Sequence, residues 1–105
     1  MFTEAEIAGI VRLIVSAVNP EEVILFGSYA KGVATFRSDL DLLVVLDTQL
    51  PLQRRKDLFQ TIQNRYAINI DVHAYTRPEV ITSMNEPYSF IRSVFSTGKI
   101  LYRRF

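Results

Sequence analysis

A chain of 105 residues allows one domain with a real hydrophobic core, but it leaves no room for a separate substrate-recognition domain. Apolar residues make up 49% of the chain and charged residues 22%, and the net charge of +1 argues neither for nor against binding of nucleic acid. Cysteine is absent, which excludes disulfides and thiolate metal sites. No apolar run approaches the roughly 20 residues that span a bilayer, and the N-terminus lacks a signal-peptide pattern, so we expect a cytoplasmic protein without membrane contact.

The first predicted element is a helix over residues 4–18. Thr3 and Glu6 have the spacing of a capping box, in which each side chain accepts a hydrogen bond from the other residue's backbone N–H group. Apolar side chains then recur at helical spacing, namely Ile7, Ile10, Val11, Ile14, Ala17 and Val18. The pair Asn19-Pro20 is expected to end this helix.

A short strand over residues 22–26 follows, and its apolar character on both faces predicts a central position in a sheet. Residues 28–31 are expected to form a short helix. Residues 32–37 are expected to form a loop. A second strand is predicted from Ser38 to about Leu46.

Residues 52–66 are predicted to form a helix, after a polar turn that ends at Pro51. Its buried stripe is expected to consist of Leu58, Phe59, Ile62 and Tyr66. The basic group Arg54-Arg55-Lys56 is expected to face water. Residues 67–75 alternate between apolar and polar side chains, which predicts a third strand with one polar face.

The last predicted elements are a short helix over residues 79–84, a helix that starts near Asn85, and an edge strand over residues 99–102. Gly98 is expected to be a left-handed cap at the end of the second of these helices. The whole order predicts an α/β (α+β) fold, a mixed β-sheet with helices mainly on one face and the other face open for chemistry.

A glycine-serine turn, Gly27-Ser28, directly follows the first predicted strand. Glycine lets the backbone approach a phosphate closely, and the N–H groups at the start of a helix attract negative charge. Asp39 and Asp41 come next, and in a strand this spacing places both carboxylates on one face, with Cα atoms about 6.6 Å apart. Because such carboxylates repel each other in an aliphatic run, the pattern indicates a cation between them, and Mg²⁺ fits.

Asp71 supplies a third carboxylate, because it lies on the polar face of the strand predicted over residues 67–75. His73 lies on the same face. A lone histidine is more often a structural residue than a ligand, and the sequence leaves both roles open for His73.

Gly27-Ser28 followed by Asp39-x-Asp41 resembles the signature of the DNA polymerase beta-like nucleotidyltransferase superfamily. The fuller string GSYAKG…SDLDLLVV is similar to that of the minimal nucleotidyltransferase (MNT) domains, and the likeness extends to Asp71. Homologues of that group are encoded beside HEPN-domain proteins as toxin–antitoxin pairs. The length fits a protein that consists of this domain alone, residues 1–105.

The resemblance implies an enzyme that transfers AMP from ATP to a tyrosine hydroxyl of a HEPN ribonuclease toxin and so acts as its antitoxin. It implies that Asp39, Asp41 and Asp71 hold two Mg²⁺ ions and that Asp71 also takes the acceptor's proton. It further implies that Gly27 and Ser28 cradle the β- and γ-phosphates.

Two other side chains are assigned to nucleotide binding, each with a plainer alternative. Lys31 stands where the MNT pattern often has arginine, and it either meets phosphate or is solvated, because lysine keeps the charge but loses the bidentate fork. Ser38 either touches the nucleotide or caps the strand that carries the aspartates. Tyr29 is expected to pack, and the basic groups 54–56 and 103–104 are expected to be solvated.

Three other functions compete with this interpretation. A non-catalytic antitoxin would mask its partner by binding, although folding alone does not require three acids beside Gly27 and Ser28. A nucleotidyltransferase for a small molecule such as an aminoglycoside is disfavoured because no second domain is present. A nucleic-acid polymerase is disfavoured because no basic channel is visible, so no direct contact with nucleic acid is expected.

Overall fold

The computed structural model describes residues 1–104. Its elements, in chain order, are α1 (Glu4–Val18), β1 (Glu22–Phe26), α2 (Gly27–Lys31), β2 (Leu40–Val45), the 3₁₀ helix η1 (Leu52–Phe59), α3 (Gln60–Gln63), β3 (Ile70–Tyr75), α4 (Arg77–Met84), α5 (Phe90–Thr97) and β4 (Lys99–Arg103). None of the helices in these residues is long and apolar enough to cross a membrane.

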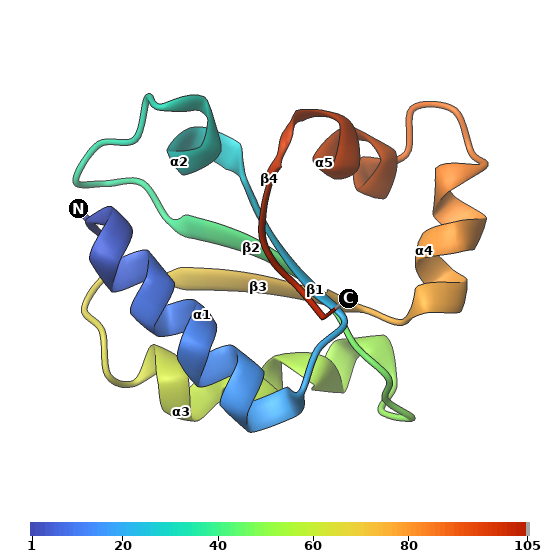
Figure 1. The fold of residues 1–105 in the computed structure, drawn as a ribbon, viewed down its shortest axis with the longest axis horizontal. Coiled ribbons are helices and arrows are strands. Elements are labelled where there is room, and N and C mark those ends of the chain that lie inside the picture. The colour runs from blue at the N-terminus through green and yellow to red at the C-terminus, as the bar shows by residue number, and fades with distance from the viewer. Residues whose placement is uncertain (105) are drawn as a thin grey trace.

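The four strands form one mixed sheet in the order β3-β2-β1-β4 (Figure 1). β1 pairs antiparallel with both β2 and β4, whereas β2 and β3 run parallel. The predicted central position of β1 is confirmed, and four of its five residues are buried. The predicted α+β fold with a mixed sheet is also confirmed.

Helix α1 begins and ends where the sequence predicts. Thr3 Oγ1 accepts a hydrogen bond from Glu6 N–H at 3.1 Å, and Glu6 Oε1 accepts one from Thr3 N–H at 2.9 Å, which completes the capping box. Asn19 ends the helix in the left-handed conformation at φ 46°, which asparagine tolerates better than most residues.

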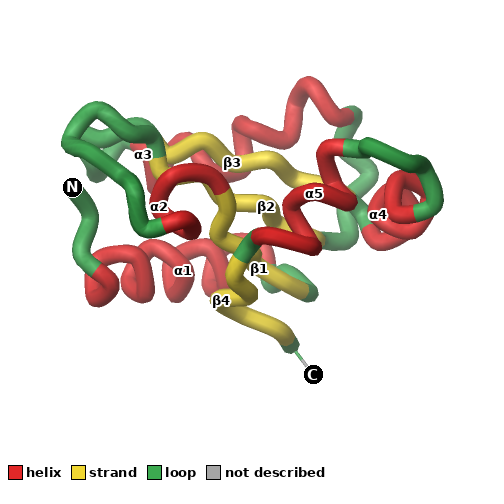
Figure 2. The backbone as a smooth tube through the Cα atoms, turned by 90° about the horizontal axis from the view of Figure 1, so that it is seen from above, coloured by secondary structure: helices red, strands yellow, loops and turns green. Residues whose placement is uncertain are grey.

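The alternation along each strand sends side chains into two hydrophobic cores, one on each face of the sheet. The larger core packs Leu40, Leu42 and Val44 against α1, η1 and α3. The smaller core packs Ile24, Leu43 and Val45 against α4 and α5. Helices α1 and α3 therefore lie on the opposite side of the sheet from α4 and α5 (Figures 1 and 2), and Tyr29 and Ala30 of the short α2 pack against the larger core.

The second face is thus not wholly open, contrary to the sequence-based expectation. Val80 of α4 and Ile91 and Val94 of α5 are each 3% exposed, because they cover the apolar part of that face. Burial of such side chains stabilises the fold by about 1.5–3 kcal/mol each. At the end of this face beside Gly27, polar side chains of β2 and β3 replace the apolar ones, among them Asp41, Asp71 and His73.

Residues 52–66 do not form the single α-helix that the sequence predicts. They form η1 and the short α3, and Phe59 and Ile62 are buried as expected. The expectation that Arg55 faces water is wrong. Its guanidinium donates to Leu50 O at 3.0 Å, to Ala74 O at 3.1 Å and to Glu79 Oε1 at 2.6 Å, so a ring of oxygen acceptors compensates for its burial.

Helix α5 begins at Phe90 rather than near Asn85. Tyr88 has a left-handed φ of 62°, and the Ser89 side chain caps the helix by accepting from Arg92 N–H at 3.0 Å. The predicted left-handed cap at Gly98 is wrong, because its φ is −81° and its ψ is 175°. Glycine is required there for a different reason, since a Cβ would lie 2.6 Å from Val94 O and 2.8 Å from Leu25 O.

Candidate functional site

The register of the three adjacent strands brings the predicted site residues together. Phe26, the last residue of β1, is the cross-strand partner of Asp41, and Asp41 is the partner of Asp71 on β3. Residues that are register partners share a face of the sheet. The structure therefore places the Asp41 and Asp71 side chains next to each other, on the face that carries the smaller core.

Asp39 lies just outside β2, which begins at Leu40 rather than at the predicted Ser38. The reason is a local turn: Ser38 Oγ accepts a hydrogen bond from Thr35 N–H at 2.9 Å, and Thr35 O accepts one from Ser38 N–H at 3.0 Å. Ser38 thus anchors the loop before the aspartates. Asp39 is exposed next to this turn.

The three carboxylates influence one another electrostatically. Burial raises the pKa of Asp41, the negative charges of Asp71 and Asp39 raise that pKa further, and His73 lowers it. Like charges that are held close together disfavour ionisation of the group between them. Asp41 is therefore the centre of a set of three acidic side chains, Asp39, Asp41 and Asp71, that a cation would stabilise. We call this set the acidic group.

Gly27 lies against Asp41 because it has no side chain. Its φ is +73°, and a Cβ at this position would overlap Asp41 Oδ2 and lie 3.1 Å from Asp41 Cγ. The N-cap residue of α2, Phe26, makes no side-chain hydrogen bond to the start of the helix, and the first N–H groups of a helix have no acceptor within the helix itself. The turn that the sequence assigns to phosphate binding thus borders the acidic group directly.

The other predicted nucleotide contacts lie on the same short helix. Ser28 is half-buried, and its carbonyl oxygen accepts a hydrogen bond from Val33 N–H at 3.0 Å. Lys31 is exposed in the last turn of α2. Tyr29 packs as expected, and its hydroxyl accepts a hydrogen bond from Phe2 N–H at 3.1 Å.

His73 and Lys56 contact Asp71. The sequence analysis had predicted neither of these contacts. His73 Nε2 lies 3.0 Å from Asp71 Oδ2, and Lys56 Nζ lies 3.9 Å from Asp71 Oδ1. The signal for His73 was its position two residues after Asp71 in a strand. No comparable signal existed for Lys56, because η1 brings it to β3 from another part of the chain.

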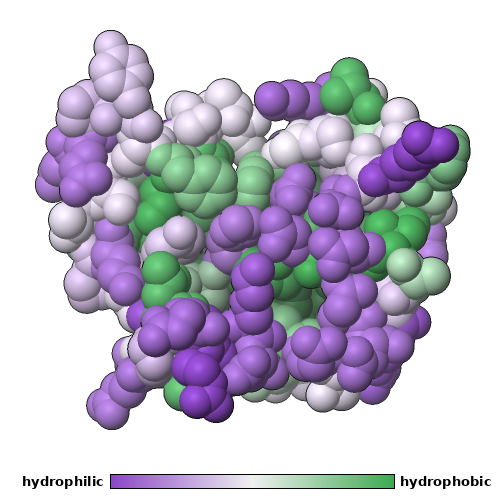
Figure 3. Space-filling view, turned by 180° about the vertical axis from the view of Figure 1, so that it is seen from behind, coloured by the Kyte–Doolittle hydropathy of each residue, from purple (hydrophilic) through white to green (hydrophobic). Residues whose placement is uncertain are grey.

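Aromatic rings adjoin the acidic group on the side of α5. The ring centroids of Phe26 and His73 are 5.5 Å apart, those of Phe26 and Phe90 are 5.4 Å apart, and those of His73 and Phe90 are 5.2 Å apart. We call these three residues the aromatic wall. Figure 3, a view from behind, shows hydrophilic side chains over most of the lower half of that face and several hydrophobic patches, the larger of them in the upper half.

The donor set fits Mg²⁺ better than a softer metal. Within residues 1–104 no group of three or more His, Cys, Asp or Glu side chains is placed so that it could hold a metal ion, so the structure does not bring Asp39, Asp41 and Asp71 into one metal-binding cluster. Mg²⁺ does not need such a cage, because it is usually held by one or two carboxylates together with substrate phosphates and water. Asp41 with Asp39 and Asp71 offers carboxylate oxygens of this kind.

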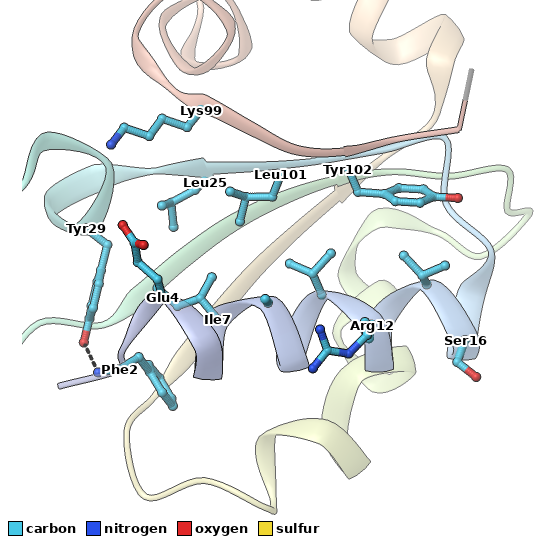
Figure 4. A pocket seen from close by; sticks show the side chains of 13 residues that line it. Phe2, Glu4, Ile7, Arg12, Ser16, Leu25, Tyr29, Lys99, Leu101 and Tyr102 are labelled. Atoms are coloured by element: carbon cyan, nitrogen blue, oxygen red, sulfur yellow. Dashed lines mark hydrogen bonds between the residues drawn. The ribbon is translucent and has the colours of Figure 1, made fainter.

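A groove of about 740 Å³ lies elsewhere. It runs between α1 and β4, and Ile7, Val11, Leu25 and Leu101 line it (Figure 4). Leu25 belongs to the larger core, so this groove is on the opposite face of the sheet from Asp41. The acidic group is therefore an open surface site and not part of this groove.

Known proteins resemble the chain over nearly its whole length. Residues 9–104 match the family model described as "Polymerase beta, Nucleotidyltransferase". A protein of Methanocaldococcus jannaschii, named as a candidate protein adenylyltransferase, is 34% identical over 82 residues, which is 78% of each chain.

Solved structures show the same fold. A candidate nucleotidyltransferase from Sulfolobus solfataricus superposes with a TM-score of 0.64 at 22% identity, over 93% of this chain and 78% of the other. The crystal structure of a toxin–antitoxin with AMP-PNP superposes with a TM-score of 0.60 at 21% identity, over 91% of this chain and 73% of the other.

Proposed function

We propose a function from one established premise: this chain belongs to the polymerase beta nucleotidyltransferase family. We infer that it is an Mg²⁺-dependent protein adenylyltransferase with a single domain over residues 1–105. It transfers AMP from ATP to a tyrosine hydroxyl of a HEPN-domain ribonuclease toxin in the cytoplasm, and it acts as the antitoxin of that toxin.

One observation carries the proposal: the register that sets Asp41 beside Asp71, with Gly27 in contact with Asp41. Nucleotidyl transfer needs a place for phosphates next to a place for charge neutralisation and proton removal. The start of α2 supports the first role and the acidic group supports the second.

In the proposed reaction the acceptor oxygen forms a bond to the α-phosphorus of ATP. The bond between that phosphorus and the bridging oxygen of the β-phosphate breaks, and pyrophosphate leaves. Asp71 takes the hydroxyl proton, and His73 orients the Asp71 carboxylate through the 3.0 Å contact. Gly27 and Ser28 hold the β- and γ-phosphates, and Lys31 adds positive charge at the far end of α2.

Two Mg²⁺ ions would be held by Asp39, Asp41 and Asp71. When bound, they would neutralise the phosphate charges and lower the pKa of the acceptor hydroxyl. The raised pKa of Asp41 supports this role, because a cation at that position would relieve the repulsion among the three carboxylates.

The choice of acceptor draws on the similar proteins. The Methanocaldococcus relative is named for protein adenylylation, and a structural neighbour is a toxin–antitoxin that was solved with AMP-PNP. The HEPN partner and its tyrosine come from the resemblance to MNT domains in the sequence.

The test is a transfer assay with ATP that carries the label on its α-phosphate, Mg²⁺ and the HEPN-domain protein encoded next to this one. We expect the label on the HEPN protein, and we expect substitution of its tyrosines to remove it. Asp41→Asn should abolish labelling and still fold, because asparagine has nearly the same shape.

A second measurement separates catalysis from masking. If cells that carry the Asp41→Asn protein survive the toxin as well as cells that carry the parent, then binding alone neutralises the toxin and the proposed reaction is wrong. Transfer of the label to an aminoglycoside, with none to the HEPN protein, would instead identify a small-molecule enzyme.

A further inference from the structure

The aromatic wall adjoins the smaller core through Phe26 and is exposed to solvent at Phe90. Its neighbours on α5, Ile91 and Val94, are each 3% exposed, whereas Phe90 is 44% exposed. Phe26 and His73 are half-buried behind it. Packing of the smaller core therefore accounts for Ile91 and Val94 but leaves much of the Phe90 ring in water.

The wall is also continuous with the proposed phosphate site. Phe26 directly precedes Gly27, and its cross-strand partner is Asp41. His73 directly contacts Asp71. A nucleotide with its terminal phosphates at Gly27-Ser28 and its α-phosphate at Asp41 would therefore have this wall next to it on the same face of the sheet.

We propose that Phe90, supported by Phe26 and His73, forms a stacking surface for the nucleobase of the bound nucleoside triphosphate. This inference rests on the proposed nucleotidyl transfer and adds the subsite that binds the base. Rings with edge and tilted contacts on their inner side are held in place, so Phe90 can present a pre-organised apolar surface.

A second exposed aromatic residue near the aspartates is less suited to this role. Phe36 is 75% exposed and lies in the loop before Ser38, outside the strands. The Arg37 guanidinium already lies 5.5 Å from the centroid of its ring. Phe36 therefore has neither the ring support of Phe90 nor a place in a helix or strand.

Stacking makes a distinctive prediction about specificity. Every nucleobase has a flat aromatic face, so stacking on a ring tolerates changes of base. The wall should therefore strengthen the binding of all four nucleoside triphosphates, and it should discriminate among them only modestly.

The experiment compares two probes, AMP-PNP and inorganic tripolyphosphate, each titrated with Mg²⁺ against the parent, Phe90→Leu and Phe90→Trp. Leucine keeps apolar bulk but lacks an aromatic face. We expect Phe90→Leu to weaken AMP-PNP binding by about tenfold, the size of one base–ring stack. The binding of tripolyphosphate, which has no base, should stay the same.

Phe90→Trp supplies an independent signal, because the chain has no tryptophan of its own. AMP-PNP should bind this variant at least as tightly as the parent and should quench its emission, and tripolyphosphate should not quench it. Tyr88→Ala is the matched control. Tyr88 is fully exposed and lies two residues from Phe90, so its removal should change neither titration.

Other results would overturn the inference. AMP-PNP that binds Phe90→Leu as it binds the parent, or a variant that loses both probes equally, would show that the ring does not hold a base. Unchanged AMP-PNP binding with a raised KM for the HEPN protein would assign the wall to the acceptor. Failure of the parent to bind AMP-PNP would instead reject the proposed nucleotidyl transfer itself.

Discussion

The two ends of the central strands β1 and β2 carry acidic residues in opposite electrostatic settings. At one end Glu22 is 6% exposed, and it pairs with Arg77 at 2.7 Å and with Arg103 at 3.4 Å. At the other end Asp41 has the like charges of Asp71 and Asp39 as neighbours. Arginine side chains neutralise the acidic charge at the first end, and no arginine within residues 1–104 does so for Asp41 at the second.

The same contrast separates the acids that adjoin β3. Beyond the end of this strand Glu79 pairs with Arg55 at 2.6 Å, which lowers the pKa of Glu79. At the start of the strand Asp71 faces the carboxylate of Asp41, and it is contacted by His73 at 3.0 Å and by the largely exposed Lys56 at 3.9 Å, without a buried arginine among the described residues. Proteins depart from electrostatic balance mainly at functional sites, so the difference separates acids that hold the fold from acids that await a cation.

The largest expected effect is on catalysis at the unbalanced end. Asp71→Asn removes the proposed base and should lower the rate of AMP transfer by about 10²–10⁴-fold. The transfer assay with α-labelled ATP measures this. Glu79→Gln, at the balanced end, is the matched control and should keep a rate close to that of the parent. Equal losses in both variants would contradict the functional distinction between the two ends.

The next effect is on stability at the balanced end. Arg55→Ala should lower the free energy of unfolding by about 2–3 kcal/mol, somewhat less than for a fully buried pair, because the Glu79 side chain is 40% exposed and water can solvate it. Urea unfolding measures this change. Arg54→Ala should change stability by less than about 0.5 kcal/mol, since the Arg54–Asp57 pair is 67% exposed on both sides. Similar losses in the two variants would show that burial does not set the value of these pairs.

The two arginines also show what a sequence can and cannot predict. Arg54 and Arg55 are adjacent in a basic run, and the sequence analysis placed both in water. Arg55 points inward because its acceptors, Ala74 O and Glu79, come from β3 and α4, about 20 residues further along the chain. Local pattern does not reveal such partners. The same limit hid the contact between Lys56 and Asp71.

The strands and the acidic group were easier to predict, because they follow from local chemistry. Alternation along β3 placed Asp71 and His73 on one face, and the aliphatic run around Asp41 indicated a strand. The start of β2 was predicted two residues too early, because a turn that Ser38 closes with Thr35 cannot be told from the start of a strand by hydropathy. The extended backbone of Gly98 was missed because Leu25 O, which excludes a side chain there, comes from a distant strand.

Gly27 provides the third prediction. Gly27→Ala should destabilise the protein by about 1–3 kcal/mol more than Gly32→Ala, because a Cβ at Gly27 overlaps Asp41. Both glycines have a φ of +73°, and at Gly32 no atom lies within 4 Å of the added carbon, so the backbone strain of about 1–2 kcal/mol is common to both. Thermal unfolding of the two variants isolates the contact. Equal losses would mean that Gly27 is required only for its backbone conformation.

The smallest effect has the opposite sign. Asp41→Asn should raise the free energy of unfolding by about 0.5–2 kcal/mol at neutral pH without divalent ions, because the neutral amide removes first the cost of burying a charge and then the repulsion from Asp71 and Asp39. The raised pKa in the folded state means that ionisation of Asp41 opposes folding. The gain should therefore vanish below the ordinary aspartate pKa of about 3.9, and it should grow as the pH rises through the higher pKa of the folded state.

Mg²⁺ with AMP-PNP should reverse the order of stability, so that the parent becomes more stable than Asp41→Asn. A ligand that binds only the folded state stabilises it by an amount that rises with the logarithm of its concentration relative to its Kd, so the parent should gain stability while Asp41→Asn, which binds the ligand weakly, gains little. Thermal unfolding of both proteins between pH 4 and 8, with and without Mg²⁺ and AMP-PNP, provides the four curves needed. An Asp41→Asn protein that is less stable than the ion-free parent at pH 7 would show that the Asp41 charge stabilises the fold, and the contrast between the two ends of the sheet would then disappear.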